Sequence, residues 1–254
     1  MRYPEPHIGE LVLDRPEAMN AISTAMARGI RAAVREIEAS ADVRAVVVTS
    51  TSDKAFCVGA DLKERNSFTD DELRAQRLLA RPAYNGVLEL PVPTVAAVHG
   101  YALGGGCELA LSCDVIVADE TAVLGLPEVS VGVIPGGGGT QLLARRVGWS
   151  RAADLIFTAR RVGAVEAYRL GLADRVVAPG MARSAALELA GAIASNSPVG
   201  VRNAKRAMRL GMDGSLAAGL EIEDAAWRAT AFSGDRKEGV AAFNEKRKPN
   251  WPGE

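Results

Sequence analysis

Two glutamates in the middle of the chain have the residue type and the surroundings expected of acid–base catalysts. Glu108 is the only Asp, Glu, Lys or Arg between Glu89 and Asp114, and Glu128 also lies in an apolar stretch. A carboxylate in such surroundings must be paired, neutral or functional, because burial penalises its charged form. The two glutamates are therefore either an acid–base pair or structural residues that accept hydrogen bonds from helix N–H groups.

Glycine-rich turns near these residues offer free backbone N–H groups. Three glycines, Gly104–Gly106, precede an apolar segment, so Gly105 is expected at a helix start with Glu108 three residues on, on the same face. A turn at Gly59–Ala60 lets the backbone approach a ligand closely in the same way. Such N–H groups hold an anion or a developing oxyanion. An ordinary strand-to-helix turn is the alternative interpretation.

A third segment places Ile134-Pro135 before four glycines, which predicts a non-helical turn, with Gly139 or Thr140 capping the next helix. It is not a phosphate-binding loop, because the lysine of Gly-x-x-x-x-Gly-Lys-Ser/Thr is absent. Neither glycine cluster matches Gly-x-Gly-x-x-Gly, and no Gly-x-Ser-x-Gly motif of a serine hydrolase occurs.

Two glycine-lined turns and two isolated carboxylates suit the reaction of a thioester through an enolate. Two N–H donors stabilise the carbonyl oxygen as it gains charge, and each donor lowers the activation free energy by about 3 kcal/mol. Two carboxylates with different pKa values then move protons to and from water and the α-carbon.

The elements that must position these residues alternate between short β-branched runs and segments of helical spacing, which indicates an α/β fold. The expected strands are Glu10–Asp14, Ala45–Thr49, Thr94–Val98 and Val115–Ala118. The expected helices are Ser23–Ser40 and a segment that begins at about Gly106.

The pattern changes after about Pro179, where one expected helix follows another without a strand. These helices are Ala182–Ser195, Pro198–Arg209, Ser215–Phe232 and Arg236–Lys246. We therefore expect residues 1–195 to form an α/β core and residues 196–254 to form a helical C-terminal region.

The composition excludes several classes of protein. The 254 residues are 48% hydrophobic and 24% charged, and Lys+Arg 30 against Asp+Glu 31 leave a net charge of -1. A nucleic-acid-binding protein usually has a strong basic excess, so no nucleic-acid partner is expected. The three cysteines and two histidines lack the spacing of a disulfide framework or a zinc site. Reduced cysteines and no bound metal are therefore expected.

The sequence also predicts a soluble, cytoplasmic protein with no membrane partner. The first residues lack the apolar core of a signal peptide. The longest apolar stretch, Val95–Cys113, contains His99 and Glu108 and is a poor membrane span.

Three segments resemble those of the crotonase family, also called the enoyl-CoA hydratase/isomerase family. They are Ala55-Phe-Cys-Val-Gly-Ala-Asp-Leu62, Gly100-Tyr-Ala-Leu-Gly-Gly-Gly-Cys-Glu-Leu109, and Pro127-Glu128 with Ile134-Pro-Gly-Gly-Gly-Gly-Thr-Gln141. The similarity runs from Asp14 to Arg247, and the segments stand in the family's order and spacing. It implies a right-handed spiral of ββα units followed by a helical C-terminal trimerisation region. A homotrimer, or a hexamer made of two trimers, is expected on the same ground.

The resemblance implies an activity and assigns roles to the residues above. The family's oxyanion hole maps onto the N–H groups of Ala60 and Gly105, and its two catalytic glutamates map onto Glu108 and Glu128. The implied reaction is hydration of a trans-2-enoyl-CoA to a 3-hydroxyacyl-CoA, as in the β-oxidation of fatty acids. Glu108 would chiefly activate the water, and Glu128 would chiefly protonate C2. No cofactor is implied, because coenzyme A is part of the acyl-CoA substrate.

The family's substrate and CoA contacts also carry over by position. They map onto Arg15, Lys54, Ala55, Phe56, Ala60, Asp61, Leu62 and Lys63 within one subunit, and onto Phe243 and Lys246 for a neighbouring subunit's site. Residues Glu64–Leu90 are expected to line or cover the acyl pocket. Cys57 and Val58 replace small alanines that are common in the family, and their bulk is expected to narrow the adenine or pantetheine groove.

Two alternatives to hydration stay open at this point. One is another reaction of the family, above all isomerisation of the double bond between positions 3 and 2. Isomerases of the family typically keep one acid–base residue, whereas both glutamates are present here. The other alternative is a CoA-binding scaffold without catalysis, which would be expected to have lost a glutamate.

Overall fold

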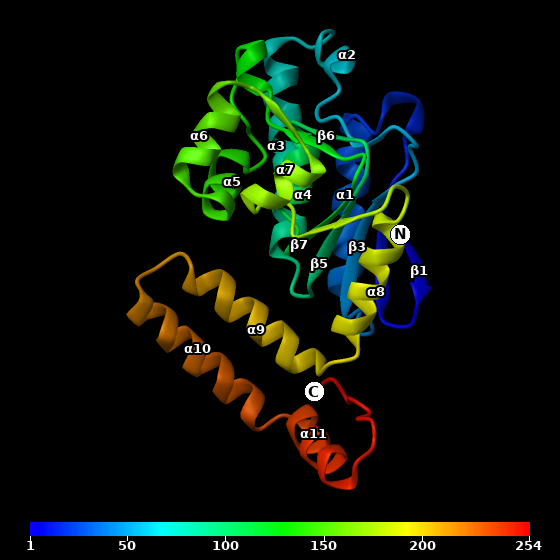
Figure 1. Ribbon diagram of the computed structural model, residues 1–254, viewed down its shortest axis with the longest axis vertical. Helices are drawn as coiled ribbons and strands as arrows, with labels where there is room; N and C mark the ends of the chain where they lie inside the picture. The colour runs from blue at the N-terminus through cyan, green and yellow to red at the C-terminus, as the bar shows by residue number, and fades with distance from the viewer.

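The computed structural model describes residues 1–254, whose strands form two sheets (Figure 1). The six-stranded sheet has the order β1-β2-β3-β5-β7-β10, and the four-stranded sheet has the order β4-β6-β8-β9. The strands of the first sheet are β1 (Arg2–Glu5), β2 (Ile8–Leu13), β3 (Ala45–Ser50), β5 (Thr94–Val98), β7 (Val115–Asp119) and β10 (Arg175–Val177). Those of the second are β4 (Ala55–Cys57), β6 (Tyr101–Leu103), β8 (Val123–Gly125) and β9 (Arg161–Gly163).

The chain winds between the two sheets as a spiral. In three successive turns it passes from a strand of the large sheet to a strand of the small one, in the pairs β3–β4, β5–β6 and β7–β8. Within each sheet these strands run parallel to their neighbours, whereas β1 and β9 are antiparallel edge strands. A helical segment follows each pair, so the predicted ββα spiral is confirmed.

The helices complete the turns and then form the C-terminal region. They are α1 (Thr24–Ala39), α2 (Leu62–Arg65), α3 (Asp70–Glu89), α4 (Gly105–Leu111), α5 (Gly139–Val147), α6 (Trp149–Phe157), α7 (Ala164–Leu170), α8 (Ala182–Ala194), α9 (Pro198–Gly211), α10 (Leu216–Ala231) and α11 (Gly234–Glu245), with short 3-10 turns η1 (Pro16–Ala18) and η2 (Glu128–Val131). Helix α1 begins after Ser23, whose side chain accepts from the Met26 N–H as an N-cap.

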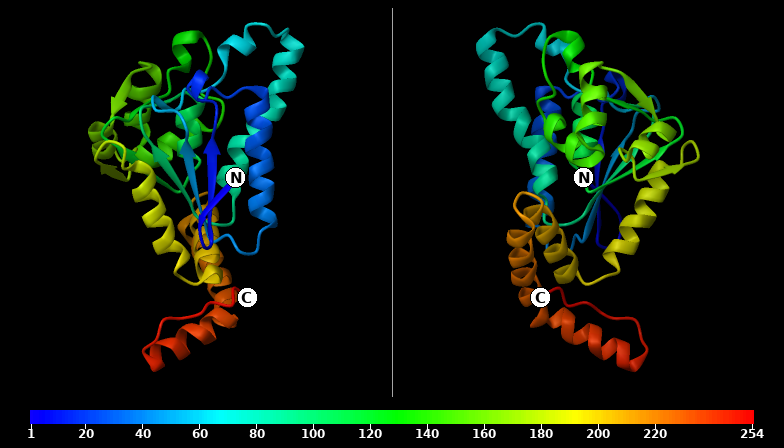
Figure 2. Two further views of the ribbon diagram at one scale, coloured as in Figure 1. Left: turned by 90° about the vertical axis from the view of Figure 1, so that its right-hand side faces the viewer. Right: turned by 60° about the vertical axis from the view of Figure 1, so that its left-hand side comes forward.

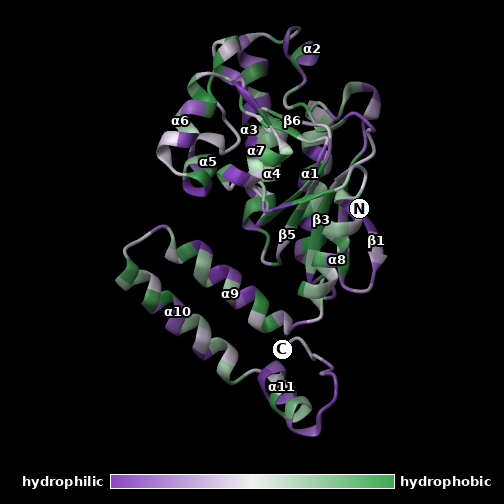
Figure 3. Cartoon of the chain, viewed as in Figure 1, coloured by the Kyte–Doolittle hydropathy of each residue, from purple (hydrophilic) through white to green (hydrophobic).

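The strands of the large sheet are buried on both faces, which explains their nearly continuous apolar sequence. In β3, Val46 and Val48 belong to the main core with α1 and α3, while Ala45 and Val47 face a second cluster with α8. The green strands β3 and β5 in Figure 3 mark this interior. Helix α8 therefore packs on the sheet and closes the core.

The last three helices lie at one end of the molecule, apart from the spiral (Figures 1 and 2). Helices α9 and α10 pack against each other, and α9 is held to the sheet by Lys205 and Arg209, which both pair with Asp114 at 2.8 Å. Large apolar side chains on these helices stay exposed, including Trp227 and Phe232. No helix has the length and hydropathy needed to span a membrane.

Two details differ from the sequence-based expectation. The residue that caps α5 is Gly138, so neither Gly139 nor Thr140 is the cap; both lie in the first turn. The strands of the small sheet were not expected, since three residues are too few to show a period of two.

Candidate active site

A cleft of about 1140 Å³ is lined by the three glycine-containing segments and by one face of α3. Its lining includes Ala60, Gly105, Glu108 and Glu128, which the sequence analysis singled out for chemistry. The α2–α3 segment contributes further side chains, among them Arg65, Leu73, Arg74, Arg77, Arg81, Tyr84 and Asn85. The expectation that residues 64–90 line a pocket therefore agrees with the position of this segment.

Glu108 is held by the glycine loop. Its Oε1 accepts from the N–H of Gly137 at 2.6 Å and from that of Gly139 at 2.8 Å, and its residue is 3% exposed. Burial raises the pKa of Glu108, while the two N–H donors and the nearby Arg77 guanidinium oppose that rise. The loop leaves Oε2 without a hydrogen bond, so this oxygen is free to accept one from a ligand.

Glu128 stands at the start of η2 in a different environment. Its Oε2 is buried and has no hydrogen-bond partner. Burial, and to a smaller extent the neighbouring Glu108 charge, raise the pKa of Glu128 to about 7. Because an unpaired buried carboxylate is costly, a substantial fraction of this side chain is protonated near neutral pH.

Two backbone N–H groups stand free beside the glutamates, those of Ala60 and Gly105. Each follows a glycine in a positive-φ conformation, Gly59 (φ +90°) and Gly104 (φ +51°), which other residues rarely adopt. The two turns touch, since a Cβ built on Gly59 would lie 2.9 Å from the Gly105 nitrogen. Neither Ala60 nor Gly105 donates a backbone hydrogen bond, so both N–H groups are available to one oxygen atom.

Tyr84 of α3 fills the space between the two glycine segments. A Cβ on Gly105 would overlap its hydroxyl, and a Cβ on Gly137 would lie 3.0 Å from its ring. The residue is 6% exposed and lines the cleft. Both glycines are therefore required by the position of a side chain that sequence analysis did not single out.

Comparison with known proteins decides the family. The model of the enoyl-CoA hydratase/isomerase family matches residues 5–254. The chain belongs to this family.

Individual relatives agree with the family match. The protein YngF of Bacillus subtilis (strain 168), which carries the same family description, is 47% identical over 249 residues, 97% of this chain and 95% of its own. The methylglutaconyl-CoA hydratase of Homo sapiens is 41% identical over 248 residues, 96% of this chain and 73% of its own. The crystal structure of an enoyl-CoA hydratase from Bacillus anthracis is 42% identical, with a TM-score of 0.97, covering 100% of this chain and 98% of that one.

Several residues that match the family's substrate contacts lie outside the cleft. The Arg15 guanidinium pairs with Asp61 at 2.5 Å, and Asp61 also accepts from the N–H groups of Lys63 and Glu64 as the N-cap of α2. This hydrogen bond to Arg15 is the main reason that the pKa of Asp61 is lowered. The Arg15 and Asp61 side chains thus brace the turn that carries Ala60.

The strand β4 supplies a second group of such residues. Ala55 and Phe56 are fully buried and their side chains do not line the cleft. Contact between their backbone and a substrate stays a prediction. The prediction that Cys57 narrows a groove is wrong, because Cys57 is fully buried and its Sγ donates to the Asn20 carbonyl. Val58 does line the cleft.

Of the remaining family positions, only Leu62 lines the cleft, whereas Lys54 and Lys63 are exposed outside it. Phe243 lies on α11 and Lys246 just after it. Helix α11 lies at the opposite end of the molecule from α2 (Figure 1). The contact of Phe243 and Lys246 with a neighbouring subunit's site stays a prediction.

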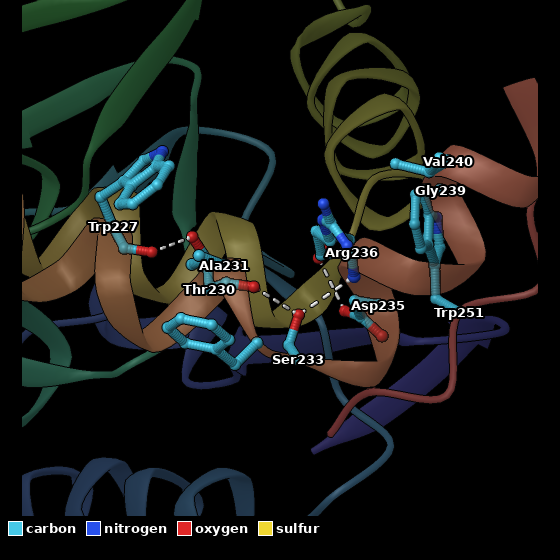
Figure 4. Close-up of a pocket in the computed structure, with 11 residues that line it drawn as sticks. Trp227, Thr230, Ala231, Ser233, Asp235, Arg236, Gly239, Val240 and Trp251 are labelled. Carbon is cyan, nitrogen blue, oxygen red and sulfur yellow. Dashed lines mark hydrogen bonds between the residues drawn. The ribbon is translucent and has the colours of Figure 1, made fainter.

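A second hollow, of about 510 Å³, lies between α10, α11 and the C-terminal tail (Figure 4). Its carboxylate, Asp235, is already engaged by Ser197 at 2.6 Å, Val199 at 3.1 Å and Gly253 at 2.7 Å. Asp235 is the only carboxylate among its lining residues, so the paired carboxylates of the first cleft have no counterpart here. No group of three or more His, Cys, Asp or Glu side chains is arranged to hold a metal ion.

Proposed function

We propose that the chain hydrates trans-2-enoyl-CoA thioesters to 3-hydroxyacyl-CoA. The observation that carries this proposal is the pair of glutamates in unlike environments, which line one cleft together with two free N–H groups. Hydration adds a hydroxyl at C3 and a proton at C2, so it requires a base and an acid near one oxyanion site.

The N–H groups of Ala60 and Gly105 are proposed to bind the thioester carbonyl oxygen. As water adds at C3, negative charge develops on this oxygen, and the donors stabilise the enolate. The positive-φ glycines before them hold the donors in place before the substrate arrives. Each donor is expected to contribute about 3 kcal/mol to the lowering of the barrier.

The environments of the glutamates support their roles. Glu108, stabilised as an anion by Gly137 and Gly139, accepts a proton from the attacking water. Glu128, whose pKa is raised to about 7, donates a proton to C2. Glu108 then holds a proton and Glu128 is ionised, and exchange with solvent restores both.

Isomerisation of a 3-enoyl-CoA to a 2-enoyl-CoA is the second candidate. A single carboxylate with a pKa near 7 can remove a proton at one carbon and return it at another, and Glu128 has this property. The Glu108 carboxylate would then be a bystander. The family includes both activities by its description.

The assembly and organisation of the chain are part of the same proposal. We infer a homotrimer or a dimer of trimers, with residues 1–195 as the core and residues 196–254 as the region that joins subunits. The exposed Trp227, Phe232 and Phe243 of the last helices support this, because large apolar side chains at a surface mark contact sites.

A hydration assay against a series of trans-2-enoyl-CoA chain lengths, with one 3-enoyl-CoA included, tests the proposal. Loss of the absorbance of the conjugated thioester reports hydration, and its gain from the 3-enoyl-CoA reports isomerisation. Turnover of 2-enoyl-CoA is expected to dominate. Gain of absorbance alone, with no water addition, would replace hydration by the second candidate.

A further inference from the structure

One side-chain hydroxyl stands where the two glycine turns of the cleft meet. The position of a Cβ built on Gly105 overlaps the Tyr84 hydroxyl and lies 3.4 Å from the Gly59 Cα. These two glycines belong to the turns whose N–H groups, those of Ala60 and Gly105, donate no backbone hydrogen bond. The Tyr84 hydroxyl therefore lies beside the place where one oxygen atom would accept from both N–H groups.

The hydroxyl of Tyr84 has no partner within the chain. The residue is 6% exposed, and its hydroxyl takes part in no hydrogen bond. Buried hydroxyl groups usually have a hydrogen-bond partner, because burial without one costs free energy. Since Tyr84 lines the cleft, a ligand atom in the cleft can supply the missing partner.

The chemistry of the hydroxyl indicates what kind of atom this partner is. Burial is the main cause that raises the pKa of the Tyr84 hydroxyl, and the nearby Glu108 and Glu128 carboxylates act in the same direction. The hydroxyl therefore keeps its proton and is available as a donor. A donor of this kind binds most strongly to an oxygen atom that carries negative charge.

The ring of Tyr84 is held in a fixed position by its surroundings. A Cβ built on Gly137 would lie 3.0 Å from two carbons of the ring, and Tyr84 belongs to the main core together with Ala83 and Val87 of the same helix. A donor that is fixed before the ligand arrives needs no reorganisation when charge develops on its acceptor. The packing of the ring thus suits the hydroxyl to transition-state stabilisation.

We propose that the Tyr84 hydroxyl is a third hydrogen-bond donor to the thioester carbonyl oxygen, beside the N–H groups of Ala60 and Gly105. The inference rests on the proposed function, because it concerns the same carbonyl oxygen. A neutral carbonyl oxygen has two lone pairs, which the two N–H groups occupy. An enolate oxygen has an additional electron pair for a third donor. The hydroxyl therefore stabilises the enolate more than the bound thioester, and it acts mainly on kcat.

A kinetic comparison tests the role of the hydroxyl. Tyr84→Phe removes the oxygen and keeps the ring that packs against Gly137. With crotonyl-CoA, kcat is expected to fall about tenfold, the scale of one hydrogen bond, while KM changes little. The control Tyr168→Phe removes an exposed hydroxyl of α7 outside the cleft and should leave both constants unchanged. A native kcat in Tyr84→Phe, or a rise in KM alone, overturns the proposal.

A ligand that cannot be hydrated separates this inference from the proposed function. Acetoacetyl-CoA carries a ketone at C3 in place of the double bond, and it ionises to an enolate that absorbs in the near ultraviolet. A pH titration of the bound ligand by absorbance therefore measures how strongly the site stabilises an enolate oxygen. Glu108 and Glu128 are present in the native protein and in both variants, so the comparison isolates the hydroxyl.

The third donor is expected to make bound acetoacetyl-CoA about tenfold more acidic in the native protein than in Tyr84→Phe, because the hydrogen bond is lost with the hydroxyl. Tyr168→Phe should match the native protein. This difference supports the proposal even if no 2-enoyl-CoA is hydrated, in which case hydration alone is refuted. Equal acidity in the native protein and Tyr84→Phe, or no enolate in either, refutes the third donor whether or not hydration is observed.

Discussion

Glu108 and Glu128 are the same amino acid in one cleft, yet they are held in opposite ways. Two backbone donors hold an oxygen of Glu108, whereas a buried oxygen of Glu128 has no partner. Hydrogen bonds to an anion favour ionisation, and desolvation without them favours the protonated form. At the scale of the residue, this asymmetry separates the proposed base from the proposed acid.

Glu128→Gln keeps the shape of the side chain and removes its exchangeable proton. The hydration rate of crotonyl-CoA is expected to fall by at least about 10²-fold, the scale of lost acid–base catalysis, with little change in CoA binding. Steady-state kinetics and calorimetric titration with coenzyme A measure the two quantities. Glu120→Gln, at an exposed position, is the matched control. Near-normal turnover of the Glu128 variant would remove this residue from the mechanism.

The pH dependence follows from the same carboxyl group. Glu128 must be protonated to act as the acid, and its pKa is raised to about 7 by burial, so kcat/KM is expected to fall as the pH rises above about 7. At low pH, protonation of Glu108 removes the base and causes a second decline. A pH profile of kcat/KM for crotonyl-CoA measures both limbs. A rate that stays level well above neutral pH contradicts the assignment of Glu128.

At the scale of the element, the site depends on how α3 and α4 meet. Helix α3 begins with a capping box between Thr69 and Glu72, and it delivers Tyr84 to the start of α4. Gly106 of α4 lies so close to the Cys57 carbonyl that a Cβ would overlap it. The small residues of α4 thus let β4 and α3 approach the oxyanion turn from two sides.

Gly105→Ala tests this packing. The new methyl group would overlap the Tyr84 hydroxyl, so the helix start or the tyrosine must move. A shift of about 1 Å in a catalytic group costs on the order of 10²-fold in rate, and a loss of this size is expected with crotonyl-CoA. Steady-state kinetics and the thermal unfolding temperature report the effect.

A double variant and a distant variant control this experiment. Tyr84→Phe removes the overlapping oxygen, so Gly105→Ala/Tyr84→Phe should recover part of the lost activity toward crotonyl-CoA. Gly29→Ala of α1 adds a methyl group that meets nothing within 4 Å and should leave activity unchanged. If the double variant is as inactive as the single one, the tyrosine is not the source of the strain.

At the scale of the whole molecule, the C-terminal helices leave large apolar side chains exposed to solvent. Phe232 and Phe243 are 82% and 83% exposed, and Figure 3 shows green segments on α9 and α10 outside the core. The chain buries its main core without them. Their attachment depends on polar contacts such as the pairs of Lys205 and Arg209 with Asp114.

Sedimentation velocity at micromolar concentration is expected to show a trimer or a hexamer. Burial of the exposed aromatic side chains between subunits supplies the driving force, at about 25 cal/mol for each Å² removed from water. Phe232→Asp should shift the distribution toward smaller species, because it places a charge in that contact. A monomeric native protein at this concentration would contradict the proposed role of residues 196–254.

Features that depend on local chemistry could be predicted from the amino-acid sequence alone. Helical spacing and β-branched runs predicted α1, β3, β5 and the four C-terminal helices to within a few residues. The glycines and the isolated glutamates marked the segments that line the cleft, because backbone freedom and a carboxylate in apolar surroundings can be recognised within a short segment. Their catalytic roles stay predictions.

Contacts between residues that are far apart in the sequence became visible in the folded chain. Arg15 and Asp61 form an ion pair, and Ala55 and Phe56 are buried. Tyr84 and Arg81 line the cleft. The short strands of the small sheet and the long helix α3, with Pro82 in its interior, are stabilised by pairing and packing with distant segments. Such contacts bring together residues far apart in sequence, so no local pattern contains them.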